Sequence, residues 1–472
     1  MPDITFDEHD IQGNSLAGFN KDHQTFLLVQ FRDAPSARAW LSTVVPRISP
    51  LSEVQDFNNL RRSMIARLGR APRSLAVSWI NIALSARGVD LLKWDGEEQL
   101  DEDAFTVGLA GGRSALLGDP PDRSKWKFGG TDKTSADALV IVASDTAPHL
   151  RTVVRELRDG IKAANLKLLY TQRGHTLDGD LRGHEHFGFR DGISQPVVRG
   201  LPQPPKPGEP QIWPGQFLLG LPRQDDADPD HPAEPLPYPE WAKNGSYVVI
   251  RRLRQDVEGF WQHMKDEATR ISAGPQFPGI DGTRLAAMLV GRWPSGAPFV
   301  LSPTSDNPDL ALSNDFGFGD SDPFPPVCPF AAHIRKVNPR RDPVEGGGPS
   351  SALTRRFLRR GIPYADSPTD RGLIFVSYQS SIQNQFEFVS RQWASSDAFP
   401  MSPPGDDAIA GFDPIIGQPD GNNRERSTML FDQAGTAVKV ALPRDFVTPT
   451  GGGYFFAPSI STLRRWSTEK AA

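Results

Sequence analysis

The sequence contains a single cysteine, Cys328, among 472 residues. It therefore cannot form an internal disulfide, and it cannot build a metal centre from a set of cysteine ligands. Any metal or redox chemistry must depend on the nine histidines, on carboxylates or on a bound cofactor.

Positive charge is not in excess, and long apolar runs are lacking. Lys and Arg (52) do not outnumber Asp and Glu (57), so the formal net charge is −5. We therefore expect no nucleic-acid partner, because such proteins carry a basic surface. No stretch reaches the about 18 apolar residues of a transmembrane helix, so we expect no membrane span. Residues 1–8 are acidic and lack the apolar core of a signal peptide. This favours a cytoplasmic protein, with secretion still open if a signal has been removed.

Glycine (43 residues) and proline (44 residues) are both abundant. Both interrupt helices, so the composition excludes a helical bundle or a long coiled coil. The length predicts about two domains. Twelve prolines fall within residues 201–240, and proline at this density fits neither a sheet interior nor a helix. We predict an N-terminal domain over 1–200, a proline-rich connection over 201–240 and a C-terminal domain over 241–472.

The N-terminal half alternates between strand-like and helix-like segments. Short runs rich in β-branched and aromatic residues predict strands, and apolar residues three or four positions apart predict helices. The predicted elements are a strand over 26–31, a helix over 34–48, strands over 74–80 and 138–143, a helix over 149–164 and a strand over 166–170. This order is that of a split βαβ, or ferredoxin-like, unit.

The C-terminal half repeats this pattern more loosely. The predicted elements are a strand over 247–250, a helix over 257–270, a strand over 373–378, a helix ending near residue 393 and a strand over 453–456. The fold class is therefore α+β, with two similar units and long glycine- and proline-rich insertions between their elements.

Asp191 and His333 are candidate functional residues. Asp191 follows the segment FGFR and precedes Gly192, so it would end a strand at a turn. Many turn aspartates only bond their own backbone. His333 follows the apolar segment PFAA and precedes the basic segment IRK. It is a candidate metal ligand or an ordinary structural histidine. The residues alone leave both alternatives open.

Arg359 and Asp413 are charged residues in apolar surroundings. Arg359 belongs to the run RRFLRR over 355–360. In a strand it would share the face of Phe357, where an arginine needs an anionic partner or a functional role. Asp413, in GFDPIIG, is either an Asp-Pro turn residue or a carboxylate that orients a histidine.

Together, these segments resemble those of the dye-decolourising peroxidases, a haem enzyme family. In chain order the similar segments are IQGNSLAGF (11–19), GFRDG (188–192), residues 328–340, FLRRG (357–361) and LIFVSYQ (373–379). The resemblance covers nearly the whole chain and is strongest to the larger fungal-type or related bacterial branch. One departure is Ala365, where the family commonly has glycine after Ile-Pro-Tyr.

The resemblance implies two ferredoxin-like domains of the dimeric α/β-barrel type, with antiparallel sheets, that bind haem b. It implies that His333 is the axial ligand of the haem iron and that Asp413 lies near it as a carboxylate partner. Asp191 and Arg359 would then be the distal catalytic pair, and Arg359 would also pair with a haem propionate. The distal pocket would be walled by Leu373 and Phe375.

The implied activity is that of a peroxidase. It would reduce hydrogen peroxide and oxidise dyes, phenols or other bulky aromatic donors through a ferryl intermediate. Because a buried haem cannot touch a bulky dye, Tyr364 and Trp393 are expected as surface residues that pass electrons. The alternative is a non-enzymatic haem carrier or iron-release protein, which would need no Asp191–Arg359 pair. The protein is expected to be a monomer or a homodimer.

Overall fold

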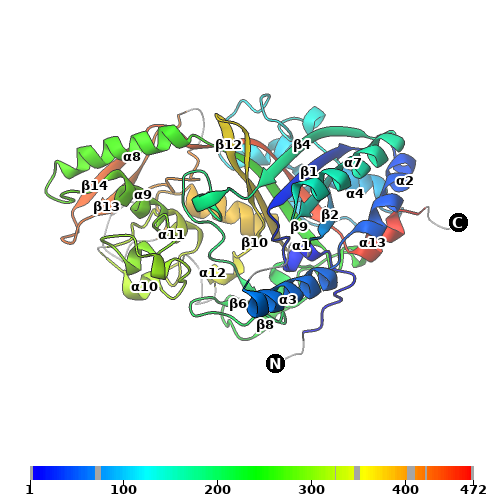
Figure 1. Cartoon of the computed structure of the whole chain (residues 1–472), viewed down its shortest axis with the longest axis horizontal. Helices are drawn as coiled ribbons and strands as arrows, with labels where there is room; N and C mark the ends of the chain where they lie inside the picture. The colour runs from blue at the N-terminus through cyan, green and yellow to red at the C-terminus, as the bar shows by residue number, and fades with distance from the viewer. Residues whose placement is uncertain are drawn as a thin grey trace.

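The computed structural model describes residues 4–69, 76–324, 326–344, 351–400, 410–419 and 423–468. Within these residues, a nine-stranded sheet is flanked by helices on one side and by a region of helices and loops at one end (Figure 1). The strands follow the order β10-β12-β9-β15-β2-β3-β1-β4, and β11 also pairs with β12. Every pairing in this sheet is antiparallel.

The N-terminal half forms one ferredoxin-like unit. Its elements are β1 (His23–Gln30), α2 (Ala34–Val44), β2 (Ser78–Leu84), β3 (Ala138–Ser144), α7 (Ala147–Ala163) and β4 (Lys167–His175). The helix α7 begins after Thr146, whose hydroxyl accepts a hydrogen bond from the His149 N–H. Its buried face carries Leu150, Leu157 and Ile161, three members of the apolar periodicity in the sequence.

The C-terminal half forms a second unit of the same kind. Its elements are β9 (Ser246–Gln255), α8 (Val257–Ser272), β11 (Ile362–Ser367), β12 (Asp370–Gln379), the helical turns η9 (Ile382–Glu387) and η10 (Val389–Ala394), and β15 (Val447–Ala457). These strands pair in the order β11-β12-β9-β15, which corresponds to β2-β3-β1-β4 in the first half. The predicted α+β fold class is therefore confirmed.

The two units share one curved sheet. They meet where Phe456 of β15 pairs with Leu84 of β2. At the far edges of the sheet β4 lies close to β11. A Cβ atom added to Gly174 of β4 would lie only 2.4 Å from the Ile362 side chain of β11. Inward-facing residues of both units therefore belong to one buried apolar cluster, which includes Phe26, Leu28, Leu139, Ile141, Ile374 and Val376. The opposite face of the sheet is covered by helices and carries a separate apolar cluster.

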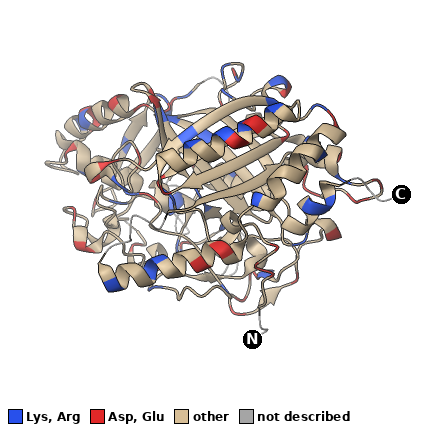
Figure 2. Cartoon of the chain, turned by 45° about the vertical axis from the view of Figure 1, so that its right-hand side comes forward, with Lys and Arg blue, Asp and Glu red and all other residues tan. Residues whose placement is uncertain are grey.

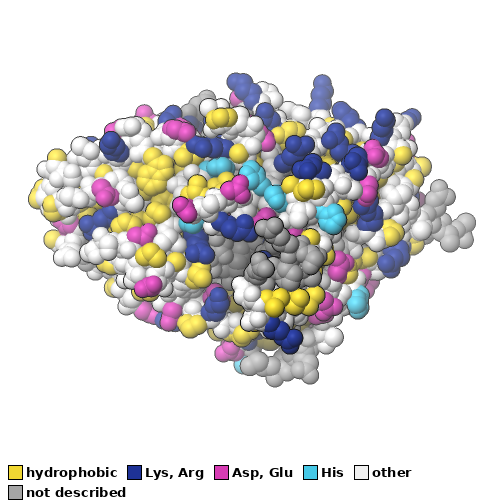
Figure 3. All heavy atoms as spheres, in the orientation of Figure 1, with side chains coloured by type: hydrophobic (Ala, Val, Ile, Leu, Met, Phe, Trp, Pro, Cys, Tyr) yellow, Lys and Arg dark blue, Asp and Glu magenta, His cyan; other side chains and the backbone are white. Residues whose placement is uncertain are grey.

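Further elements surround these units. The longer ones are α3 (Leu51–Leu68), α4 (Ala86–Leu92), α9 (Gly282–Val290), α11 (His333–Val337), α13 (Ile460–Trp466) and the hairpin β13 (Arg426–Phe431) and β14 (Ala437–Leu442). Figure 2 marks charged residues of both signs along the helices that cover the sheet, and Figure 3 shows side chains of both signs interspersed over one face of the molecule. None of the described helices is long and apolar enough to span a membrane.

The boundaries of several elements differ from the sequence-based expectations. The strand predicted over 74–80 begins at Ser78 and continues to Leu84, and positions 74 and 75 lie outside the described residues. The strand includes polar Asn81, whose side chain accepts from the Asn14 N–H and donates to Ser49. The helix predicted over 34–48 ends at Val44, followed by a 3₁₀ turn that contains Pro46.

The proline-rich connection is more ordered than a free linker. It contains the short strands β6 (Gln211–Ile212), β7 (Arg223–Gln224) and β8 (Pro232–Ala233). Phe217 and Leu218 within it are fully buried in the core. The domain boundaries at residues 200 and 240 stay predictions.

Arg335 anchors the short helix α11, which begins at His333. Its guanidinium is fully buried and donates to both oxygens of Asp342 at 2.8 and 2.7 Å, and to Asp322 at 3.0 Å. It also lies over the rings of Phe318 and Phe330. One cation thus joins α11 to two carboxylates of the flanking loops, and this holds the helix in position beside them.

We predict that Arg335→Leu destabilises the protein by about 3–5 kcal/mol, because two buried carboxylates lose their cation. Equilibrium chemical denaturation of the variant and the wild type would measure this loss. The matched control is Arg47→Leu, since Arg47 forms an ion pair with Glu156 at 2.8 Å in which both side chains are substantially exposed. The control should change the free energy of unfolding by less than about 1 kcal/mol. Equal losses in the two variants would contradict the anchoring role.

Candidate active site

A cavity of about 740 Å³ lies against the helix-covered face of β9 and β12. Its size is in the range of cofactor pockets. Asp191 from the N-terminal half lines it together with Arg359 and His333 from the C-terminal half. The side chains of Leu373 and Phe375, two positions apart on β12, also line it. The structure therefore brings these five predicted residues to one cavity.

His333 and Asp413 form a hydrogen-bonded pair beside this cavity. His333 Nδ1 lies 2.8 Å from Asp413 Oδ2. Asp413 is completely buried, and its other oxygen accepts the backbone N–H groups of Ile415 and Ile416 at 2.8 and 3.0 Å. In a neutral imidazole, a carboxylate at this position favours the tautomer with the proton on Nδ1, which leaves the lone pair on Nε2. This tautomer is the one that a metal-binding imidazole requires.

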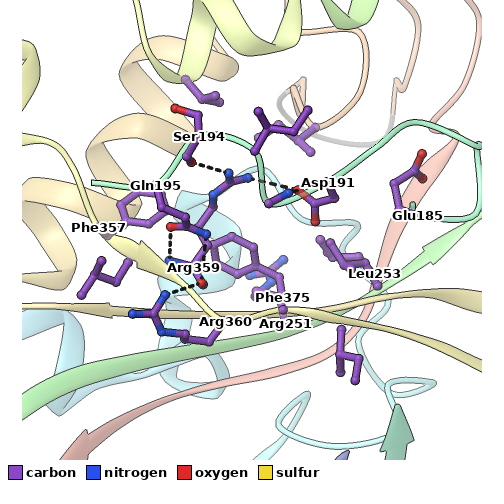
Figure 4. Close-up of a pocket in the computed structure, with 18 of the residues that line it drawn as sticks. Glu185, Asp191, Ser194, Gln195, Arg251, Leu253, Phe357, Arg359, Arg360 and Phe375 are labelled. Atoms are coloured by element: carbon purple, nitrogen blue, oxygen red, sulfur yellow. Dashed lines mark hydrogen bonds and ion pairs between the residues drawn. The ribbon is translucent and has the colours of Figure 1, made fainter. Parts of the chain in front are cut away.

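Asp191 and Arg359 form the second charged pair of the cavity. Arg359 Nη1 lies 3.5 Å from Asp191 Oδ1, and Arg359 Nη2 donates to the backbone oxygen of Ser194 at 2.8 Å (Figure 4). Asp191 Oδ1 also accepts the Gly192 N–H at 2.6 Å. Both side chains keep about a third of their surface exposed, at 39% for Asp191 and 32% for Arg359. They are therefore positioned and still accessible to a small molecule in the cavity.

Gln195 positions Arg359 and was not singled out in the sequence. Its side-chain amide accepts the Arg359 N–H at 3.2 Å and donates to the Arg359 carbonyl at 3.1 Å (Figure 4). This two-point contact joins the loop after Asp191 to β10 (Leu358–Arg359). The expectation that Asp191 ends a strand is wrong, because it lies in a loop in which His184 and Arg190 form an isolated bridge and no strand.

Glu185 is a further carboxylate of the cavity lining that the sequence did not reveal. It accepts the N–H groups of Phe187 and Phe189 at 2.8 and 2.9 Å and is also hydrogen-bonded to the Gln255 side chain. Burial raises the pKa of Glu185 to about 7 despite these donors. Its bonds shape the turn that leads to Asp191.

Several buried or half-buried arginines of the cavity lining lack a carboxylate ion-pair partner among the described residues. Arg340 donates to the Asn314 side chain and backbone and to Ser194, and Arg292 donates to backbone oxygens and to Asn314. Burial lowers the pKa of Arg340 to about 10 and that of Arg356 to about 9. A buried cation is costly unless an anion compensates it. This lining therefore fits a ligand that carries negative charge.

Tyr364 and Trp393 do not lie at the surface, so this part of the expectation is wrong. Tyr364 is fully buried under the Arg252 guanidinium, 4.1 Å from its ring centroid. Trp393 is 4% exposed and stacks on Phe399 with ring centroids 5.0 Å apart. Whether either ring passes electrons stays a prediction.

The chain matches two family models. Residues 10–182 match the DyP dimeric alpha+beta barrel domain, and residues 299–400 match the C-terminal part of Dyp-type peroxidases. Dye-decolorizing peroxidase msp1 of Mycetinis scorodonius is 32% identical over 96% of this chain and 86% of its own length. The multifunctional dye peroxidase DyP2 of Amycolatopsis sp. is 30% identical over 96% of this chain and 95% of its own. A solved dye-decolorizing peroxidase in complex with 2,6-dimethoxyphenol is 31% identical, covers 98% of this chain and 100% of that one, and has a TM-score of 0.78.

The chain belongs to the dye-decolorizing peroxidase family. It is a peroxidase that reduces hydrogen peroxide and oxidises dyes and phenols, which favours the enzyme hypothesis over the haem-carrier alternative. Peroxidases of this family are haem enzymes, and the cavity fits that group. It offers an imidazole with one free nitrogen, and its uncompensated arginines match the two carboxylates of a haem.

The raised pKa of Glu185 predicts a pH-dependent stability. Its folded pKa of about 7 exceeds the ordinary value of 4.5, so the folded protein binds more protons between these values. The free energy of unfolding of the haem-free protein should therefore fall, by about 1–3 kcal/mol, as pH rises through this window. In Glu185→Gln this contribution should disappear. Chemical denaturation at several pH values would measure both slopes, and identical slopes would contradict the assignment.

Arg356 provides a test of the anionic ligand. Arg356→Leu should stabilise the haem-free protein by about 1 kcal/mol or more, because it removes a buried cation without a described counterion. The same variant should bind haem at least about tenfold more weakly, which is about 1.4 kcal/mol. Denaturation of the haem-free protein and titration with haem would measure the two effects. A loss of stability together with unchanged haem affinity would show that Arg356 pairs with the protein instead.

Proposed function

We propose that the cavity binds haem b with His333 as the axial ligand, and that Asp191 and Arg359 act on hydrogen peroxide. The observation that carries this proposal is the presence of both pairs, His333–Asp413 and Asp191–Arg359, at one cavity. Bound haem would supply the iron at which peroxide is reduced and the oxidising equivalents that aromatic donors consume.

Asp413 acts through His333. By accepting the Nδ1 proton, the buried carboxylate makes the imidazole a stronger donor to iron and holds the ring in one orientation. Its own position is fixed by the two backbone N–H groups of residues 415 and 416. It is therefore a positioning residue whose effect is transmitted through the ligand.

Asp191 moves the proton of the reaction. As a carboxylate it accepts a proton from the first peroxide oxygen, and as an acid it returns this proton to the departing oxygen, which leaves as water. Arg359 stays charged throughout and stabilises negative charge on the peroxide while the O–O bond breaks. Leu373 and Phe375 limit the water that competes for these groups. Arg340 and Arg356 are proposed to bind the haem carboxylates.

The experiment is the reaction of Asp191→Asn with peroxide. The amide keeps the size of the side chain but cannot carry the proton, so the rate of the peroxide step should fall by about 10²–10⁴-fold. Stopped-flow absorbance of the haem after mixing with peroxide would measure this rate at equal haem content.

The matched control is Asp180→Asn. Asp180 is an exposed acid in the segment after β4 that also carries Asp191, and it does not line the cavity. Its rate should equal that of the wild type. If Asp191→Asn also reacts at the wild-type rate, Asp191 is not the base. The oligomeric state, monomer or homodimer, stays a prediction.

A further inference from the structure

Tyr454 on β15 has an unusual partner for a buried tyrosine. Its side chain is buried, at 3% exposure, and its hydroxyl donates to Glu387 Oε1 at 2.9 Å. Glu387 is itself only 3% exposed. Burial and the neighbouring carboxylate raise the pKa of Tyr454 well above its ordinary value, so the resting phenol keeps its proton. The pair is therefore a neutral phenol that points at a buried base.

Glu387 forms an ion pair with Arg113. Arg113 Nε donates to Glu387 Oε1 at 3.0 Å, and Arg113 Nη2 contacts Glu387 Oε2. Arg113 also bonds the exposed carboxylate of Asp103 at 3.0 Å. The cation compensates the buried charge of Glu387 but leaves Oε1 in contact with the phenol. A proton acceptor thus stands at hydrogen-bond distance from a group that releases a proton only when it is oxidised.

Aromatic side chains connect Tyr454 with the cavity. The ring of Phe386 lines the cavity and lies 6.2 Å from the Tyr454 ring, centroid to centroid. Phe375, which lies beside Arg359 in Figure 4, also lines the cavity and is 5.8 Å from Phe386. Arg251, another lining residue, is two positions along β9 from Val249, the register partner of Tyr454. Tyr454 is therefore one ring away from the cavity.

The other tyrosines differ in their partners. Within the described residues, Tyr454 is the one tyrosine whose hydroxyl lies within 3 Å of a carboxylate. Tyr364 reaches Asp370 only at 3.4 Å, Tyr170 donates to Gln172, and Tyr378 accepts from Asn14. A general base acts at a heavy-atom distance of about 2.6–3.2 Å. The geometry for coupled loss of an electron and a proton is thus specific to Tyr454.

We propose that Tyr454 is a redox-active tyrosine that stores one oxidising equivalent of the peroxidase reaction. After peroxide has oxidised the cofactor, one electron passes from the Tyr454 ring to the cofactor. The phenolic O–H bond breaks, and its proton forms a new O–H bond with Glu387, which leaves a neutral phenoxyl radical. An electron from an aromatic donor and the return of the proton from Glu387 restore the phenol. This proposal rests on the haem peroxidase function proposed above.

The test is electron paramagnetic resonance of samples frozen shortly after mixing the haem-loaded protein with one equivalent of peroxide, without any donor. The wild type should form a tyrosyl radical, identified by the narrowing of its signal when the protein carries ring-deuterated tyrosine. Tyr454→Phe should lose this signal, although its haem absorbance still responds to peroxide. Glu387→Gln, whose amide oxygen can accept the hydrogen bond but not the proton, should form less radical.

The matched control is Tyr247→Phe, because Tyr247 is equally buried in the same apolar cluster. This variant should keep the wild-type signal. If Tyr454→Phe keeps the full tyrosyl signal, or if the wild type forms none while its haem absorbance responds to peroxide, the assignment of Tyr454 is overturned. A wild-type haem absorbance that does not respond to peroxide would overturn the proposed function and the assignment with it.

Discussion

The hydrogen bond between His333 Nδ1 and Asp413 is the interaction on which the site depends. It joins residues 80 positions apart and decides which ring nitrogen stays free. Both partners are held in place by neighbouring groups. Asp413 is held by the backbone N–H groups that follow it, and the helix that begins with His333 is held by Arg335 between two buried carboxylates. The ion pairs of Arg335 with the surrounding loops thus help to orient the His333 ring at the cavity.

A second constraint is the positive charge of the cavity lining. Arg356 is buried and Arg340 is half-buried, neither forms an ion pair within the described residues, and Arg359 has the carboxylate of Asp191 at 3.5 Å. These cations lower the stability of the haem-free protein, and a bound ligand with two carboxylates would compensate their charge. Ligand binding and fold stability are therefore coupled, because an anion that binds only the folded protein stabilises it. The same cations leave Arg359 available for a charge that develops during the reaction.

The sequence predicts the fold well because the strands carry strong local signals. The strand β3 is a continuous apolar run, and α7 has a clear apolar face with a capping threonine. The hairpin β13–β14 and the turns η9 and η10 were not predicted in this form, because their geometry depends on packing against distant segments. Tyr364 and Trp393 were expected at the surface because a bulky dye cannot touch a buried haem, but both are buried. An aromatic residue has the same local signature whether it is covered or exposed.

The site residues differ in the same way: some could be expected from their own sequence segment, and others depend on partners that are distant in the sequence. Asp191, His333 and Arg359 stand in segments that resemble a family, so their roles could be expected. Glu185 and Gln195 were missed, because each acts through backbone groups that only the folded loops bring close. The sequence order of Asp413 and His333 says nothing of a 2.8 Å contact. Residues that orient others are thus the hardest to find from sequence, since their partners are set by topology.

The environments of Asp191 and Glu387 show how one protein can separate two proton transfers. Asp191 is 39% exposed in the cavity and lies 3.5 Å from its arginine, so a proton can be exchanged with a small reactant. Glu387 is buried and bonded directly to Arg113 and Tyr454, so it can exchange a proton only with its fixed phenol. Two carboxylates in such different surroundings serve different partners. In the proposals above, the first acts on peroxide, and the second accepts the proton that Tyr454 releases when its ring gives an electron to the cofactor.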